Sequence, residues 1–191
     1  VPTDRTSSFD KVFSFVLPCA DVDVNADYTD NLSADGGLFA NIPLTGEKVV
    51  NIPVGVSSFN VYDDGGLEYE YSNNADGSLV LKAPDGYLMQ VTGDASVWSD
   101  TLTIYDGTAE SNVLLEQKDF GSVGTLVSSG NMLTVRFASN GSITYDGIFL
   151  TVALFNVNDE HLVSVPEASD EGSVVSDVNS ASYGATVSLT A

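Results

Sequence analysis

The sequence predicts an all-β protein, an antiparallel sandwich or barrel, and two observations predict this class. Apolar and polar residues alternate in short runs, which is the period of a strand. Clusters of glycine with asparagine or aspartate separate these runs and supply the backbone conformations that tight turns require. No stretch keeps a helical period over three turns, so the strands follow one another without intervening helices.

The expected strands and turns alternate along the chain. The alternating runs, each expected to be a strand, are residues 12–17, 22–28, 79–82, 102–105, 132–137 and 148–154. The expected turns lie at 63–66, 73–77, 84–86, 129–131 and 140–141.

Three zones differ in composition. Residues 1–30 contain three phenylalanines and two expected strands, and residues 31–156 are a continuous series of strands and glycine turns. Residues 157–191 are rich in serine, valine and aspartate and end on an alternating run without a following turn. We expect the middle zone to be one domain and the two flanks to be parts of neighbouring domains.

The charge of the chain is strongly acidic. Lys and Arg total 6 against 27 Asp and Glu, which gives a formal net charge of -21. Such a charge repels phosphate backbones and anionic headgroups, so nucleic acid and membrane-surface partners are not expected. The hydrophobic fraction of 43% predicts a folded core rather than disorder. The acidity itself has two readings: a solvated surface that keeps a secreted protein soluble, or binding of divalent cations.

The sequence offers little for catalysis. Nucleophilic catalysis needs a base beside the nucleophile, and His161 is the one histidine of the chain. We expect His161 to be a strand-face residue and Cys19, which cannot form an internal disulfide, to be a small buried hydrophobe. Paired carboxylates suffice for a glycosidase, but chance pairs are expected in so acidic a chain, and one tryptophan hardly lines a sugar cleft. We therefore expect no enzyme activity.

No run approaches the length of a membrane span, and no charged-then-apolar leader opens the sequence. If the protein is exported, its signal and anchor are expected outside this sequence.

The central zone contains a characteristic series of motifs: FNVYDDGG at 59–66, YSNNADG at 71–77, DTLTIYDG at 100–107 and SSGNMLTVRF at 128–137, followed by GIF at 147–149. On these motifs the central zone resembles a CUB domain of the cysteine-poor bacterial kind. The resemblance covers about residues 46–155 and implies a compact sandwich of two antiparallel sheets. The usual disulfides of the family are absent, and Ala75 stands where some relatives place a cysteine.

The flanks are similar to two halves of an internalin-type B-repeat. Residues 13–28 are similar to the closing strands of such a repeat, whereas 161–165, 172–174 and 183–191 are similar to the opening strands of the next. This implies a slice from a repeat array on a secreted or cell-surface bacterial protein. Half repeats cannot bury their own faces. The ends are therefore expected to pair with each other, to pair between molecules, or to be poorly ordered.

The CUB resemblance also implies a calcium site. Many CUB domains hold calcium through three acidic residues: one late in a strand, one before the Asp-Gly strand and one in the loop after the Arg-Phe strand. Asp100 matches the second position, while the first falls near Thr92, with Asp94 the nearest carboxylate. The third falls at Asn140, whose amide oxygen can ligate, and Asp146 lies in the same loop. The alternative is that these carboxylates are solvated or cap turns.

Three aromatic residues are candidate ligand-binding residues. Trp98 lies in an expected polar loop, 93–99, where an exposed indole can stack on a sugar face beside neighbouring aspartates. Tyr69 and Tyr71 are two residues apart and are expected on one strand face. The alternative is that Trp98 caps one end of the core and that both tyrosines are packed.

These observations leave three hypotheses for function. The first is a non-catalytic adhesion module that presents loops to a protein or glycan partner. The second is a carbohydrate-binding module attached to a protein that degrades or captures polysaccharides, and the third is a spacer in the repeat array. A glycan array discriminates between them, with Trp98→Ala abolishing binding under the second hypothesis.

Overall fold

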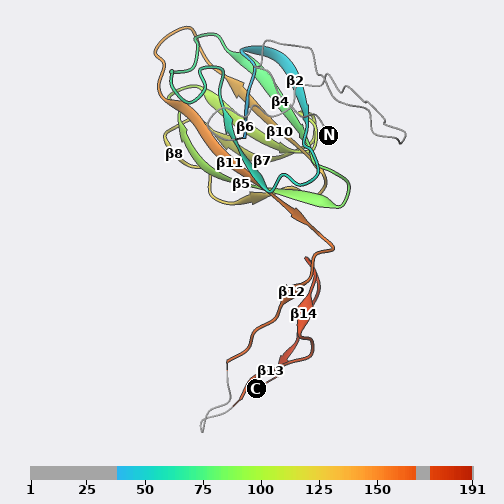
Figure 1. Cartoon of the computed structure of the whole chain (residues 1–191). Coiled ribbons are helices and arrows are strands. Elements are labelled where there is room, and N and C mark those ends of the chain that lie inside the picture. Colours follow the sequence, from blue (N-terminus) through green and yellow to red (C-terminus); the bar gives the residue numbers. More distant parts are fainter. Residues whose placement is uncertain (1–37, 167–172, 191) are drawn as a thin grey trace, which may run out of the picture.

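The computed structural model describes residues 38–166 and 173–190, and the described chain is all-β. Its main body is a sandwich of two sheets (Figure 1). The first sheet has six strands, and five of them run in the order β1, β3, β11, β5, β8, with β9 also pairing with β5. Their bounds are Phe39–Asn41 (β1), Ser58–Tyr62 (β3), Gly147–Asn156 (β11), Tyr87–Ser96 (β5), Gly121–Ser122 (β8) and Leu126–Val127 (β9).

The second sheet has five strands in the order β2, β4, β10, β6, β7. Their bounds are Thr45–Asn51 (β2), Asp76–Lys82 (β4), Met132–Ala138 (β10), Thr101–Asp106 (β6) and Asn112–Gln117 (β7). The four runs expected between residues 79 and 154 all lie within strands, namely β4, β6, β10 and β11. The two runs expected at 12–17 and 22–28 lie outside the described residues.

The sandwich was expected to be antiparallel throughout, and this is wrong at one edge of each sheet. β1 pairs with β3 in parallel, and β2 pairs with β4 in parallel. Both sheets are therefore mixed. Parallel neighbours cannot be joined by a hairpin, so β2 and the turn after it intervene between β1 and β3. Alternation within a strand carries no signal for the direction of its neighbour.

The core lies between the inner faces of the two sheets. The period of two points every second residue inward, and these residues are aliphatic or aromatic. Fully buried examples are Val61, Val91 and Leu150 from the first sheet and Leu81, Ile104, Val135 and Phe137 from the second. The sandwich therefore has one continuous hydrophobic core.

The polar loop expected at 93–99 is shorter than expected. Residues 93–96 belong to β5, which pairs with β11 over all ten of its residues. The alternation continues through this segment because Ala95 is buried while Asp94 is exposed. Gly93 has φ +133°, and a Cβ there would lie 2.2 Å from the carbonyl oxygen of Phe149. Glycine therefore allows the close approach of β11, and the loop is confined to residues 97–100.

The C-terminal segment forms two small ladders of its own, which extend away from the sandwich (Figure 1). β12 (His161–Leu162) pairs with β14 (Ser180–Ala181), and β13 (Val175–Ser176) pairs with β15 (Leu189–Thr190). The expectation that the last strand is hydrogen-bonded is confirmed. Its partner is β13, within the same C-terminal segment. The simplest pairing proposed was with residues 22–27, which lie outside the described residues. His161 lies exposed on a strand face, as expected.

In the described part of the chain, no helix has the length and apolar character needed to cross a membrane.

Candidate functional site

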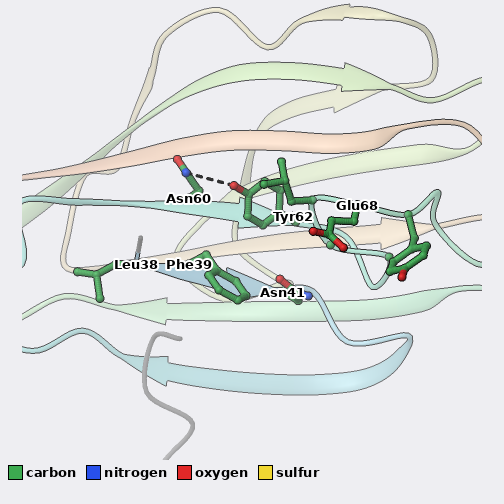
Figure 2. A pocket seen from close by; sticks show the side chains of 10 residues that line it. Leu38, Phe39, Asn41, Asn60, Tyr62 and Glu68 are labelled. Carbon is green, nitrogen blue, oxygen red and sulfur yellow. Dashed lines mark hydrogen bonds between the residues drawn. The ribbon is translucent and has the colours of Figure 1, made fainter. Parts of the chain in front are cut away.

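A groove lies on the outer face of the first sheet, at its β1 edge. Outward-facing residues of β1 and β3 form its floor, because the register places Phe39 opposite Asn60 and Asn41 opposite Tyr62. Figure 2 shows these four side chains on two neighbouring strands. The groove has a volume of about 280 Å³. It is a shallow site in which side chains of two strands meet a loop.

The loop after β3 forms the wall of the groove. Residues Gly65 to Tyr69 line it, and Leu67, Glu68 and Tyr69 are exposed. Tyr69 is 72% exposed, the largest value of any aromatic residue in the described chain. Gly65 lets this loop turn tightly, since a Cβ there would lie 2.3 Å from the carbonyl oxygen of Glu70. The wall is therefore a compact turn.

Asp63 fixes the base of this wall. It is fully buried, and its carboxylate accepts hydrogen bonds from the backbone N–H groups of Gly65 at 2.9 Å and Ile148 at 2.7 Å. Burial, the largest cause, raises the pKa of Asp63 from 3.8 to about 6, while the two backbone hydrogen bonds act in the opposite direction. Farther along the loop, Glu70 accepts a hydrogen bond from Thr144. The wall is thus anchored at both ends.

The floor contains aromatic rings and side-chain amides. Tyr62 packs edge-on against Phe39, with ring centroids 6.0 Å apart. Asn60 is satisfied within the floor: it donates to the Tyr62 hydroxyl at 3.2 Å and accepts from Thr151 at 3.2 Å. Asn41 differs, because its Oδ1 is buried and accepts no hydrogen bond from any residue that the structure describes. Burying an amide oxygen without a donor costs free energy, and a ligand that donates a hydrogen bond to Asn41 would recover part of that cost.

The three predicted ligand-binding aromatics do not form one platform. Tyr69 lines the groove, whereas Tyr71 is 1% exposed and belongs to the core. The two tyrosines were expected on one strand face, and this is wrong because residues 63–75 form turns and loop between β3 and β4. Trp98 is 52% exposed and lies in the short loop after β5. Its ring packs against Phe120, whose ring packs against Tyr145, at centroid distances of 6.0 and 5.0 Å.

Tyr71 instead belongs to a buried polar cluster beneath Trp98. Its hydroxyl donates to Oδ2 of Asp100 at 2.7 Å, and its ring packs on Phe137. Burial, followed by the hydrogen bond and the charge of Asp100, raises the pKa of Tyr71 well above its usual range. The other oxygen of Asp100 accepts from the backbone and side-chain amides of Asn140, both at 2.7 Å. Asp100 is 2% exposed and accepts hydrogen bonds at both oxygens.

The four predicted calcium ligands are partly brought together. Asp100 and Asn140 are in contact, but Asn140 offers N–H groups to the carboxylate, while its Oδ1 accepts from the Ser142 backbone at 2.8 Å. Asp94 is exposed on β5 opposite Phe149, and Asp146 is exposed in the loop before β11. Within residues 38–166 and 173–190, no group of three or more acidic, histidine or cysteine side chains is placed to hold a metal ion.

The sequence interpretation did not identify Phe39, Asn41, Asn60 or Tyr62 as site residues. Their outward positions on β1 and β3 are consistent with alternation, because Ala40 and Val61 beside them are buried. The signal that could have found them is an aromatic residue and an amide on the solvent-facing side of two strands. Only the parallel pairing of β1 with β3 makes these positions neighbours.

Comparisons with known proteins give matches to solved structures alone. No family model matches the sequence, and no curated protein matches it. The chain is similar in fold to the full extracellular region of zebrafish Gpr126/Adgrg6, with 17% identity and a TM-score of 0.42 over 66% of this chain and 17% of that one.

It is also similar to the CUB1-EGF-CUB2 domains of rat MASP-1, with 13% identity and a TM-score of 0.48 over 59% of this chain and 44% of that one. For the CUB1-EGF-CUB2 domain of human MASP-1/3, the identity is 14% and the TM-score is 0.45, over 54% of this chain and 43% of that one. The chain therefore spans less than half the length of each of these solved chains. Both MASP-1 structures contain CUB domains.

Proposed function

We propose that this chain is a non-catalytic extracellular binding module, carried by a surface or secreted bacterial protein, that holds its ligand in the groove beside β1. The observation that carries the proposal is the combination of the exposed Tyr69 ring and half-buried amide side chains with a wall fixed by buried hydrogen bonds. A site whose walls are fixed before binding loses little conformational entropy when the ligand enters.

The chemistry of the groove favours binding over catalysis. Glu68 is the one carboxylate among the lining residues, and Asp63 beneath the wall is buried and bonded to backbone N–H groups. Hydrolysis of a glycosidic bond generally uses two carboxylates facing each other across the substrate. The groove supplies hydrogen-bonding groups and ring surfaces, which are the features of a recognition site.

The test compares two exposed aromatics on different surfaces. Wild type, Tyr69→Ala and Trp98→Ala are screened on immobilised glycan and protein arrays, and ligands found there are titrated. We expect Tyr69→Ala to weaken binding about tenfold or more, since an exposed aromatic at a binding site commonly contributes over ~1 kcal/mol. Trp98→Ala is the matched control and should leave the affinity unchanged. If Tyr69→Ala binds a ligand as tightly as wild type does, the groove is not the binding site of that ligand. If no ligand is found on either array, the result supports a spacer role instead.

A second candidate is a protein partner at the Trp98 loop. Trp98 and Phe120 are exposed and in contact, and aromatic clusters of this kind are enriched at protein interfaces. Trp98 is the one tryptophan of the sequence, so its fluorescence reports this surface alone. A protein ligand that shifts Trp98 emission and is lost in Trp98→Ala would establish this second surface.

Calcium at the Trp98 end remains a prediction. The residues in place fit it incompletely, because both oxygens of Asp100 already accept hydrogen bonds and Asp94 lies on the outer face of the sheet. Calcium binding would require Asp100 to exchange these donors for the ion. If the folded protein binds calcium and the free calcium concentration is a hundred times the dissociation constant, the free energy of unfolding rises by about 2.7 kcal/mol. A wild-type melting temperature that millimolar calcium does not raise would contradict the site, and so would an equal rise in Asp100→Ala.

The flanking zones remain proposals as well. We propose that residues 157–191 open a repeat unit, and the small ladders of β12 to β15 are consistent with strands of an incomplete unit. The proposed closing repeat at 1–30 lies outside the described residues.

A further inference from the structure

We infer that the ligand of the groove is a neutral saccharide, recognised by the Asn41 amide and the Tyr62 hydroxyl between the rings of Phe39 and Tyr69. This inference rests on the proposed function and names the chemical class of its ligand. Four properties of the groove lead to it.

The first property is charge. Among the described residues that line the groove none is cationic, and the exposed Glu68 is one of them. The whole chain carries a formal net charge of -21. An anionic ligand would therefore meet repulsion from Glu68 and from the protein as a whole, without an Arg or Lys to pair with. This excludes uronic acid and sulfated sugars in favour of uncharged ones.

The second property is the hydrogen-bonding inventory of the floor. The Oδ1 of Asn41 is buried and has no donor among the residues that the structure describes. A turn about χ2, which has a broad energy minimum, would present it to the groove without breaking a bond to Oδ1 from those residues. The Tyr62 hydroxyl accepts from Asn60, so its own proton is available to an acceptor. A sugar hydroxyl both donates and accepts, which suits one free acceptor beside one free donor.

The third property is the arrangement of aromatic rings. Phe39 in the floor and Tyr69 in the wall both line the groove, so two aromatic rings from different elements border it. The Tyr62 ring is held edge-on against Phe39 and, on its other side, packs at 5.5 Å from Phe149. Fixed rings offer flat surfaces to the C–H faces of a pyranose at little entropic cost.

The fourth property is size. A volume of about 280 Å³ lies at the lower end of the usual range for ligand pockets, ~300–1,000 Å³. The groove is open along the outer face of the sheet, where Phe149 and Asp94 continue the row of side chains beyond Tyr62. One or two sugar rings of a longer neutral chain fit such a site.

The experiment titrates three ligand classes by calorimetry: neutral oligosaccharides chosen from a glycan array, oligogalacturonate as an acidic saccharide, and a lysine-rich peptide. Asn41→Leu keeps the side-chain volume but removes the amide, and we expect it to weaken neutral saccharide binding about tenfold or more. Asn112→Leu, at an exposed position in the second sheet, is the matched control and should bind as wild type does. Far-UV circular dichroism and thermal transitions show whether each variant is folded.

Glu68→Gln separates neutral from cationic ligands, and it changes only an exposed residue. A neutral saccharide should bind this variant within about threefold of wild type, with little dependence on salt, because no ion pair is lost. If the lysine-rich peptide binds wild type and this binding is lost in Glu68→Gln, the inference of a saccharide ligand is overturned, while the groove is still a binding site. Failure of every neutral saccharide on the array would also overturn the inference of a saccharide ligand. Binding of any class that Tyr69→Ala leaves unchanged would overturn the proposed function itself.

Discussion

Removing the Tyr71 hydroxyl should destabilise the whole sandwich, although Tyr71 lies in a loop. Tyr71→Phe keeps the ring against Phe137 but leaves Oδ2 of Asp100 buried without its donor at 2.7 Å. Hydrogen bonds to charged groups contribute about 1.5–3 kcal/mol, so we expect a loss of about 2 kcal/mol. For a chain of this length, that loss lowers Tm by roughly 4–8 °C.

The assay is urea denaturation, followed by Trp98 fluorescence and by far-UV circular dichroism. Tyr69→Phe is the matched control, because it removes a hydroxyl from a tyrosine that is 72% exposed, and its effect should stay within about 0.5 kcal/mol. A double-mutant cycle of Tyr71→Phe with Asp100→Asn measures the coupling between the two side chains. A Tyr71→Phe effect as small as the control, or additive double-mutant energies, would refute the assigned hydrogen bond as a source of stability.

Three further predictions concern the same sandwich. The pKa of Asp63 is raised from 3.8 to about 6 in the folded state, so its contribution to stability is full below pH 3.8 and is lost as the pH rises through 6. At 1.36 kcal/mol per unit of pKa difference, this loss of stability is about 3 kcal/mol. Asp63→Asn should not show the loss, so the prediction is contradicted if the free energy of unfolding in urea changes with pH equally in both proteins. Gly93→Ala forces a Cβ to 2.2 Å from the Phe149 carbonyl oxygen and should cost about 2 kcal/mol or more in thermal melts, whereas Gly130→Ala, with open space around it, should be neutral. A chain cut to about residues 36–156 should keep one cooperative thermal transition, since the strands described after residue 160 pair within the C-terminal segment and not with the two main sheets. An insoluble or molten product would show that the flanks belong to the same domain.

Four strands of the sandwich, β4, β6, β10 and β11, could be predicted from sequence because burial on one face imposes a period of two on each strand separately. The strands β1, β2, β3, β5 and β7 were not among the expected runs. The runs at 102–105 and 132–137 lie within β6 and β10, and the expected turn at 84–86 joins β4 to β5. The prediction of a loop over all of 93–99 was wrong for a local reason. Its small and polar residues suggested a loop, but Gly93 permits the close approach of two long paired strands.

The candidate site was predicted only in part. Tyr69 was singled out and lines the groove, but Tyr71, two residues away, is buried against Asp100. The difference arises because residues 63–75 form a folded loop, in which neighbours in sequence face opposite environments. Trp98 is exposed, which is one of the two alternatives that the sequence left open. Its ring packs against Phe120, and Phe120 packs against Tyr145, both from distant parts of the chain.

The sequence by itself determined the all-β class, the positions of four strands of the sandwich and of turns such as 84–86, and the acidic charge that disfavours anionic partners. Only the tertiary structure decided which strands are neighbours. The parallel pairing of β1 with β3 places Asn41 beside Tyr62, and the hydrogen bonds of Asp63 fold the loop carrying Tyr69 over them. The physical reason is one of range: alternation records whether each residue faces the core, whereas strand order and loop path depend on contacts between residues far apart in the chain.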